Sequence, residues 1–345
     1  MHPFHYLYFV KKRGTRFIPY FLVVAFFAIS SLLVGFGKKN YFKGLPADFP
    51  EMKIPEGNEI TKDRVALGKR LFFDKNLSVN GEVACISCHN PALAFADDQS
   101  ISGGVEGRFA KRNAPTLTNV GYNPVYLFDG FLTTLEMQAL VPIQEHEEMD
   151  FNMVELAKRL NQDPSYVKQA QKSYGRNAVD GYVITRALGT YQRTLISYNS
   201  KYDLYKKGKR KLSDSEEKGR DLFFNKLHCA QCHSGFNFTN FSTQNNGLYE
   251  IYADSGRMRA TELESDRALF KIPTLRNIQL TAPYMHDGSI SSLKGVIAHY
   301  KSGGKNHANK NELIKPFELS DSETQNLIDF LYTLTDWKFI KKHKV

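Results

Sequence analysis

The sequence has no cysteine outside two short motifs, so no thiol is free for lipidation. It also lacks a convincing series of alternating apolar and polar residues, and we therefore do not expect a β-sandwich or barrel. No run of lysine and arginine is interleaved with aromatic residues, which argues against nucleic-acid binding. We interpret the net charge of +10 as a solvated basic face.

The four cysteines that are present form two copies of Cys-x-x-Cys-His, one at Cys85, Cys88 and His89 and one at Cys229, Cys232 and His233. This is the attachment motif of c-type haem, in which the thiols bond to the porphyrin and the histidine ligates iron. A zinc site made from the four cysteines would leave both histidines without a role. A thioredoxin-like site would follow a strand, whereas the first motif follows a helical segment. The motifs therefore predict two covalently bound haem c groups.

The first 36 residues contain no acid and include an uncharged run from Phe17 to Phe36. At about 1.5 Å per residue, this run spans roughly the 30 Å thickness of the hydrocarbon core of a membrane. Basic residues precede it, as in an export signal, but its length favours an uncleaved membrane anchor. We predict a signal or anchor segment at residues 1–37 and a proline-containing linker at 38–59. The haem domains are then expected on the periplasmic side of the cytoplasmic membrane.

The remainder of the chain repeats one plan. Thr116 and Thr274 each lie 13 residues before the aspartate of an Asp-Gly pair, at Asp129 and Asp287. Similar segments, Gly68–Phe73 and Gly219–Phe224, precede the two haem motifs. We predict an all-α protein with two cytochrome c-like haem domains that arose by internal duplication. The N-terminal domain, with connecting helices, covers 60–205, and the C-terminal domain covers 206–345.

Helical periodicity and capping signals support this fold class. Apolar residues recur at helical spacing over Met153–Leu160 and Val183–Tyr198. Ser213 with Glu216, and Ser320 with Glu323, form predicted capping boxes at the start of two later helices.

The duplication also predicts the distal ligands of the haems. Thirteen residues beyond each Asp-Gly aspartate, the N-terminal copy has Pro142 and the C-terminal copy has Tyr300. Proline cannot ligate iron, so the first haem should keep an open face. Tyrosinate is a known haem ligand, which makes Tyr300 the candidate for the second iron. His299, Met285 and Met258 are rival ligands, and a tyrosine packed at the haem edge is the alternative.

Beyond the haem motifs, the chain resembles the bacterial diheme cytochrome c peroxidase family, from about Ile60 to Trp337. That family includes the enzyme that matures the tryptophan tryptophylquinone of methylamine dehydrogenase. The matching segments are Arg112-Asn113-Ala114-Pro115-Thr116, Phe128-Asp129-Gly130, Gln138, Glu148-Met149, Pro273-Thr274-Leu275-Arg276-Asn277 and Pro283-Tyr284-Met285-His286-Asp287-Gly288. The resemblance implies that the N-terminal haem reduces peroxide while the C-terminal haem takes in and stores electrons.

The resemblance also implies roles for individual residues. Gln138 and Glu148 match the distal pocket of the peroxidatic haem, and Glu148 matches the acid–base catalyst. The chemistry alone does not choose Glu148 over Glu145 and Glu147, since any of the three could move a proton.

A calcium ion is a further implied ligand. Asn113, Thr281 and Pro283 match the positions that hold calcium between the haems, and oxygen ligands of this kind suit that ion.

The chain departs from the family pattern in two places. Many members carry a histidine that blocks the peroxidatic iron until the other haem is reduced, but no histidine lies between His89 and His146. We therefore expect the oxidised enzyme to bind peroxide directly. The tryptophan that usually bridges the haems is Phe128 here, which argues against hole hopping through this position.

The leading hypothesis is a peroxidase that reduces hydrogen peroxide to water with electrons from a small exported cytochrome c or cupredoxin. One alternative is an enzyme that uses a bis-iron high-valent state to oxidise residues of a partner protein, although Trp337 is its only tryptophan. A second alternative is a non-enzymatic diheme electron carrier. The resemblance also suggests a homodimer.

Overall fold

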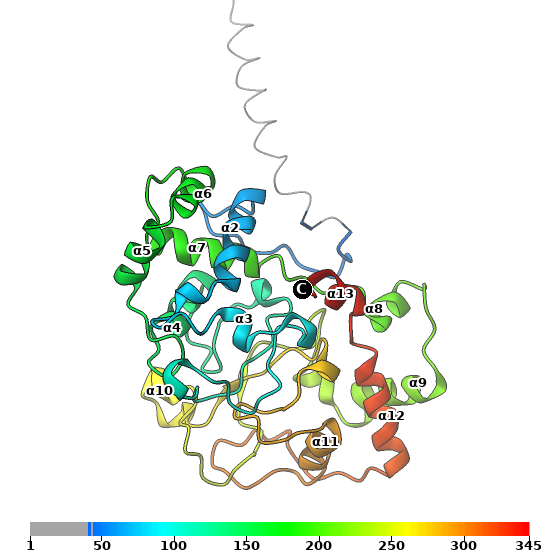
Figure 1. Cartoon of the computed structure of the whole chain (residues 1–345). Coiled ribbons are helices and arrows are strands. Elements are labelled where there is room, and N and C mark those ends of the chain that lie inside the picture. The colour runs from blue at the N-terminus through cyan, green and yellow to red at the C-terminus, as the bar shows by residue number, and fades with distance from the viewer. Residues whose placement is uncertain (1–40, 43, 345) are drawn as a thin grey trace, which may run out of the picture.

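The computed structural model describes residues 41, 42 and 44–344. The predicted signal or anchor segment at 1–37 therefore lies outside the described residues. Within the described part of the chain, no helix is both long enough and apolar enough to cross a membrane. Figure 1 shows short helices joined by long loops, with very little strand. The fold is mostly helical, and one pair of short strands is a small departure from the predicted all-α class.

The first half of the molecule is built on five helices around a short one that carries the first haem motif. The bounds are α2 (Lys62–Phe73), α3 (Cys85–Cys88), α4 (Leu135–Gln144), α5 (Met153–Asn161), α6 (Pro164–Tyr174) and α7 (Gly181–Gln192). Single 3₁₀ turns lie between them at Lys75–Leu77, Pro91–Leu93, Val105–Gly107 and Val120–Tyr122.

The second half has mostly shorter helices and one pair of short strands. Its helices are α8 (Lys201–Lys206), α9 (Asp214–Asp221), α10 (Met258–Thr261), α11 (Leu293–Lys301), α12 (Asp321–Tyr332) and α13 (Trp337–His343). A π-helical turn at Leu222–Lys226 continues α9, and 3₁₀ turns lie at Cys229–Gln231, Glu264–Asp266 and Ile278–Leu280. The strands β1 (Thr243–Gln244) and β2 (Phe270–Lys271) pair antiparallel, with Thr243 opposite Lys271.

Both predicted capping boxes are confirmed, because Ser213 and Ser320 each accept a bond from the backbone three residues on. The helix predicted over Val183–Tyr198 is too long, since α7 ends at Gln192. The side chain of Asn119 explains the earlier end. It accepts a hydrogen bond from the Ser197 backbone N–H at 2.8 Å and donates to the Ser197 carbonyl at 3.1 Å, which holds this segment out of the helix.

Two glycines show that the halves share one packing arrangement. A Cβ on Gly68 of α2 would lie 1.9 Å from the Ala187 carbonyl oxygen of α7. A Cβ on Gly219 of α9 would likewise lie 1.9 Å from the Asn326 carbonyl oxygen of α12. Because only glycine permits such close approach, the sequence repeat corresponds to the same helix crossing in each domain. The predicted internal duplication is therefore visible in three dimensions.

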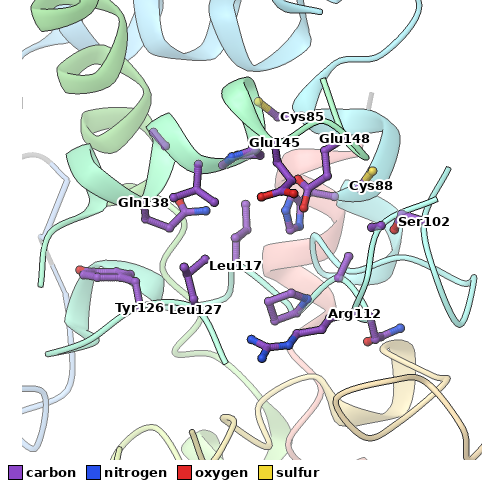
Figure 2. Close-up of a pocket in the computed structure, with 18 of the residues that line it drawn as sticks. Cys85, Cys88, Ser102, Arg112, Leu117, Tyr126, Leu127, Gln138, Glu145 and Glu148 are labelled. Carbon is purple, nitrogen blue, oxygen red and sulfur yellow. The ribbon is translucent and has the colours of Figure 1, made fainter. Parts of the chain in front are cut away.

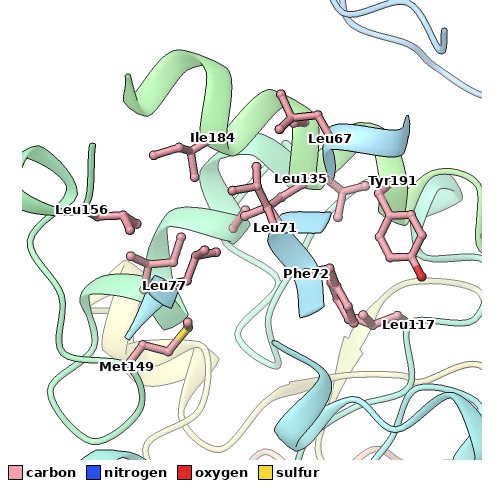
Figure 3. Packing of buried hydrophobic residues seen from close by; sticks show 14 of the residues in the cluster. Leu67, Leu71, Phe72, Leu77, Leu117, Leu135, Met149, Leu156, Ile184 and Tyr191 are labelled. Atoms are coloured by element: carbon pink, nitrogen blue, oxygen red, sulfur yellow. The ribbon is translucent and has the colours of Figure 1, made fainter. Parts of the chain in front are cut away.

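Each half has its own apolar core. Figure 3 shows the first core, where Leu67, Leu71 and Phe72 of α2 pack against Leu135 and Ile184. The second core collects apolar side chains of α8, the π-helical turn, α11 and α12, namely Tyr202, Leu222, Phe223, Leu293, Ile297, Leu327, Ile328, Phe330 and Leu331. The last helix, α13, crosses back, and its Phe339 and Ile340 pack into the first core.

Candidate active site

The first haem motif lies on α3 and the residue after it, and its histidine is held in a defined orientation. Nδ1 of His89 lies 2.9 Å from the backbone oxygen of Phe95. Because a carbonyl oxygen only accepts, Nδ1 donates and Nε2 keeps its lone pair, as an iron ligand must. Burial lowers the pKa of His89, which favours the neutral imidazole.

The thiols do not have the properties of a redox or zinc motif. Burial raises the pKa of Cys85 to about 12 and the pKa of Cys88 and Cys229 to about 11. A thioredoxin-like site needs a thiol of lowered pKa. No group of three or more His, Cys, Asp or Glu residues in the described part of the chain could hold a metal ion. The four cysteines therefore do not form a shared zinc site.

A cavity opens beside the first motif. Its volume is about 230 Å³. Figure 2 shows Gln138 and Glu148 pointing into this space, with Cys85 and Cys88 along its edge.

The cavity fits haem c chemically. His89 and both thiols of the motif line it, together with apolar side chains such as Leu117 and Val120. Lys271 lines it too, and burial lowers the pKa of this lysine to about 8 with no carboxylate beside it among the described residues. A buried cation needs a counter-charge, and the propionate carboxylates of a haem would supply one.

The wall opposite the motif comes from α4 and the turn that follows it. Thr134 caps α4 by accepting from the Met137 backbone N–H at 3.2 Å. The helix then places Gln138 and Pro142 on the cavity surface. The proline occupies the position where the duplicated copy has Tyr300, and it offers no iron ligand.

Glu148 differs from its two acidic neighbours. Glu145 and Glu147 both pair with Lys111, at 3.3 and 3.0 Å. Glu148 forms no ion pair in the part of the chain that the structure describes, and it lines the cavity. Burial raises the pKa of Glu148 to about 7, and the charges of Glu145 and Glu147 add to this shift. The structure therefore distinguishes Glu148 from Glu145 and Glu147, which the sequence alone did not do.

The second haem motif repeats the histidine geometry of the first. Nδ1 of His233 lies 3.2 Å from the backbone oxygen of Phe238, and burial lowers the pKa of His233 to about 4. Tyr300 of α11 lies near this motif. Burial raises the pKa of the Tyr300 hydroxyl, and the nearby thiols of Cys229 and Cys232 add to this shift.

Two of the three rival ligands of the second iron, His299 and Met285, form hydrogen bonds with Asn246. Nε2 of His299 donates to the Asn246 backbone oxygen at 3.0 Å, and the sulfur of Met285 accepts from the Asn246 side-chain amide at 3.3 Å. Met258 begins α10, where the neighbouring Arg259 reaches Asp129 of the first domain.

Comparison with known proteins gives consistent results. Residues 62–211 match the family model for di-haem cytochrome c peroxidase, and residues 216–335 match the model for cytochrome c. The methylamine utilization protein MauG of Methylorubrum extorquens is 36% identical over 81% of this chain and 80% of its own length. The cytochrome c551 peroxidase of Nitrosomonas europaea is 34% identical over 84% of this chain and 85% of its own.

This chain belongs to the di-haem cytochrome c peroxidase family. The membership confirms the predicted peroxidase class and two cytochrome c-type domains with haem c. A solved structure agrees as well. The chain matches the crystal structure of a MauG-like protein associated with microbial copper homeostasis with a TM-score of 0.82 and 32% identity, over 86% of this chain and 96% of that one.

The loop at residues 104–109, which has no histidine, packs directly on the turn that carries Glu148. The backbone N–H of Val105 donates to the Glu148 carbonyl oxygen at 2.9 Å. Arg108 donates to Asp150 at 2.8 Å and contacts His146 at 2.7 and 2.8 Å. The loop therefore braces the segment that carries Glu148.

Gly104 allows this loop to lie close to the backbone of Glu147 and Glu148. A Cβ on Gly104 would lie 2.0 Å from the Glu147 carbonyl oxygen and 2.9 Å from that of Glu148. We expect Gly104→Ala to displace Glu148 and to lower peroxide turnover by about tenfold or more. The matched control is Gly103→Ala, since a Cβ there meets nothing within 4 Å. Equal turnover in the two variants, with both haems attached, would show that the contact does not position Glu148.

The residues predicted to hold calcium are only partly brought together. The backbone N–H of Asn113 donates to the His286 carbonyl oxygen at 2.9 Å, which places Asn113 beside the 283–288 loop. Its side-chain amide donates to the backbone oxygens of Gln99 and Ser100. The Thr281 hydroxyl donates within its own turn, to Ile278. Pro283 follows a cis peptide bond.

Sequence reasoning missed Lys271 as a cavity residue. The duplication aligns Lys271-Ile272-Pro273 with Asn113-Ala114-Pro115, which places Lys271 opposite Asn113 but does not show that it lines a cavity. A lysine before an apolar pair does not by itself indicate a buried position, so only the fold identifies it as a cation that faces the first haem cavity.

Proposed function

We propose that this protein reduces hydrogen peroxide to water at the first haem site, with Glu148 as the acid–base group and Gln138 as an orienting amide. The observation that carries the proposal is the unpaired Glu148 carboxyl, whose pKa is about 7 and which shares a cavity with His89. The haem iron, when bound to Nε2 of His89, supplies the site that binds and reduces peroxide. The overall reaction consumes one peroxide, two electrons and two protons and yields two waters.

The pKa of Glu148 suits proton transfer in both directions. Near neutral pH, a carboxyl with a pKa of about 7 is present in both forms, so it can accept a peroxide proton and return it to the departing oxygen. The Gln138 amide keeps the same protonation at all relevant pH values and can both donate and accept hydrogen bonds. Its role is therefore to orient peroxide rather than to move protons.

The pH dependence of the peroxide reaction tests this proposal. Because the raised pKa leaves Glu148 protonated below pH 7, the rate for the oxidised enzyme should rise as pH increases through about 7 and then level off. Stopped-flow absorbance with excess peroxide measures the rate. A profile without a step near pH 7, or with its step near the ordinary glutamate pKa, would contradict the role of Glu148.

We propose that electrons from a partner enter at the second haem. We propose that Tyr300 is the distal ligand of the second iron, since it lies near Cys229 and Cys232 and occupies the helix position that corresponds to Pro142 in the first domain. We propose a small exported cytochrome c or cupredoxin as the donor, a periplasmic location, and an anchor in residues 1–37.

The proposal also includes a calcium site and a domain boundary. Asn113, Thr281 and Pro283 are proposed to hold a calcium ion, supported by the position of Asn113 beside the 283–288 loop. The domains are proposed to divide near residue 205, although α13 packs on the first core.

A second candidate function is oxidation of residues in a partner protein. It is favoured by Tyr300 and by the loop 104–109 without a histidine, and MauG is among the relatives. Phe128 in place of the bridging tryptophan disfavours it. The two functions are separated by whether peroxide consumption depends on a small redox donor or on a specific partner protein.

A further inference from the structure

Two exposed segments of the described chain each carry a group of basic side chains. The first is residues 206–211, which have five basic side chains in six positions, all exposed: Lys206, Lys207, Lys209, Arg210 and Lys211. Only Lys206 of these forms an ion pair within the described residues, with Asp48. The other four basic side chains form no ion pair with the described residues.

The second segment is α13 and the residue after it. Its Phe339 and Ile340 are buried in the first core, whereas Lys338, Lys341, Lys342 and Lys344 are exposed and form no ion pair in the described chain. Trp337, the single tryptophan, is 60% exposed at the start of this helix. One side of α13 is therefore anchored in the protein, and its outer side presents cations and an indole ring.

Hydrogen bonds bring the starts of α8 and α13 together. Asp336, which caps α13, accepts from the backbone N–H groups of Tyr198 and Asn199 at 2.9 and 2.8 Å. The Tyr202 N–H in α8 donates to the Thr333 carbonyl oxygen at 3.0 Å. Figure 1 shows α8 and α13 next to the point where the described chain begins. The ion pair of Lys206 with Asp48 confirms this proximity.

We propose that this basic edge, defined as residues 206–211 and α13 with Lys344, lies on an anionic lipid surface. Lysine attracts anionic headgroups, and tryptophan prefers the membrane–water interface. The chain also carries an uncharged run at Phe17–Phe36, a short distance before the described residues begin at this edge. A bilayer that held that run would therefore lie beside the basic edge. An acidic protein partner would also match the charge and the exposed indole, but the uncharged run close to this edge favours the membrane.

The inference rests on the proposed membrane anchor and is independent of the peroxidase chemistry. The proposal assigns part of the positive charge to a membrane-binding surface, whereas the sequence alone suggested only a solvated basic face. When the edge contacts the membrane, α13 would fix the orientation of the first domain, because its buried side is part of that core. Each cation near an anionic surface should add about fivefold to membrane partitioning.

Lysine acetylation followed by mass spectrometry can locate the contact in the full-length holoprotein. The protein is reconstituted into vesicles of phosphatidylcholine alone or of phosphatidylcholine with phosphatidylglycerol. Acetylation of Lys207, Lys209, Lys341 and Lys342 should fall about tenfold in the anionic vesicles and recover at high salt. Lys294 and Lys315 serve as controls. Both are exposed, and α11, which carries Lys294, lies far from residue 41 in Figure 1.

A charge-reversal variant tests the mechanism of protection. Replacing Lys207, Lys209, Lys341 and Lys342 by Glu should make the acetylation of Lys338 and Lys344 independent of phosphatidylglycerol. Peroxide turnover should not change, which separates this proposal from the proposed function. Equal acetylation in the two vesicle types would overturn the proposal. Protection that appears only when an acidic redox protein is added would also overturn it and would assign the edge to the electron donor.

Discussion

Replacing Glu148 with Gln lowers peroxide turnover by about 10²-fold or more, with both haems still attached. The amide keeps the size of the carboxyl but can neither accept nor return the peroxide proton. It also removes the group whose pKa is raised to about 7, so the pH step in the peroxide reaction should disappear with the activity. Steady-state turnover and the absorbance of the two haems measure the two outcomes.

Glu145→Gln is the matched control for this variant. Glu145 lines the same cavity but pairs with Lys111 at 3.3 Å, so its carboxylate is already committed. We expect less than a tenfold loss in this variant, together with a lower pKa for Glu148, because one neighbouring negative charge is removed. If Glu148→Gln retained normal turnover while Glu145→Gln lost it, the acid–base role would belong to Glu145.

Replacing Arg276 with Met destabilises the C-terminal domain by about 3–5 kcal/mol. The Arg276 guanidinium is fully buried and donates to both carboxylate oxygens of Asp203, at 2.8 and 2.9 Å. It also donates to the Phe236 backbone oxygen at 2.7 Å. The variant leaves the buried Asp203 carboxylate without its counter-charge. Denaturant unfolding followed by the absorbance of the second haem measures the change.

An exposed ion pair provides the comparison. Arg267 binds Glu264 with two short bonds of 2.7 Å, but both side chains are largely exposed. Arg267→Met should therefore destabilise the protein far less than Arg276→Met, because solvent screens this ion pair. A loss of similar size in both variants would indicate that Arg276 acts through general packing rather than through charge in a dry interior.

Short-range chemistry made much of the site predictable from the sequence. Cys-x-x-Cys-His motifs specify a covalent cofactor and one iron ligand within five residues. The duplication predicted that Pro142 and Tyr300 are equivalent, and each is in fact the eighth residue of its helix, α4 or α11. Capping residues such as Ser213 and Ser320 were predictable because the cap forms with a residue three positions away.

Features that depend on long-range contacts were not predictable in this way. Lys111 selects among the three glutamates by pairing with two of them across more than thirty residues of sequence. Gly104 matters only because its backbone meets the turn at Glu147. The return of α13 to the first core could not be inferred either, since the buried Phe339 and Ile340 would suit either core.

The electronic spectrum of the purified oxidised protein, before and after one equivalent of hydrogen peroxide and without prior reduction, tests the central claim most directly. An open first site, with Pro142 on its wall and no histidine in the 104–109 loop, predicts one high-spin haem that reacts immediately. Two low-spin haems that do not react would contradict the account. That result would mean that an unrecognised ligand closes the first iron and that the enzyme needs reductive activation.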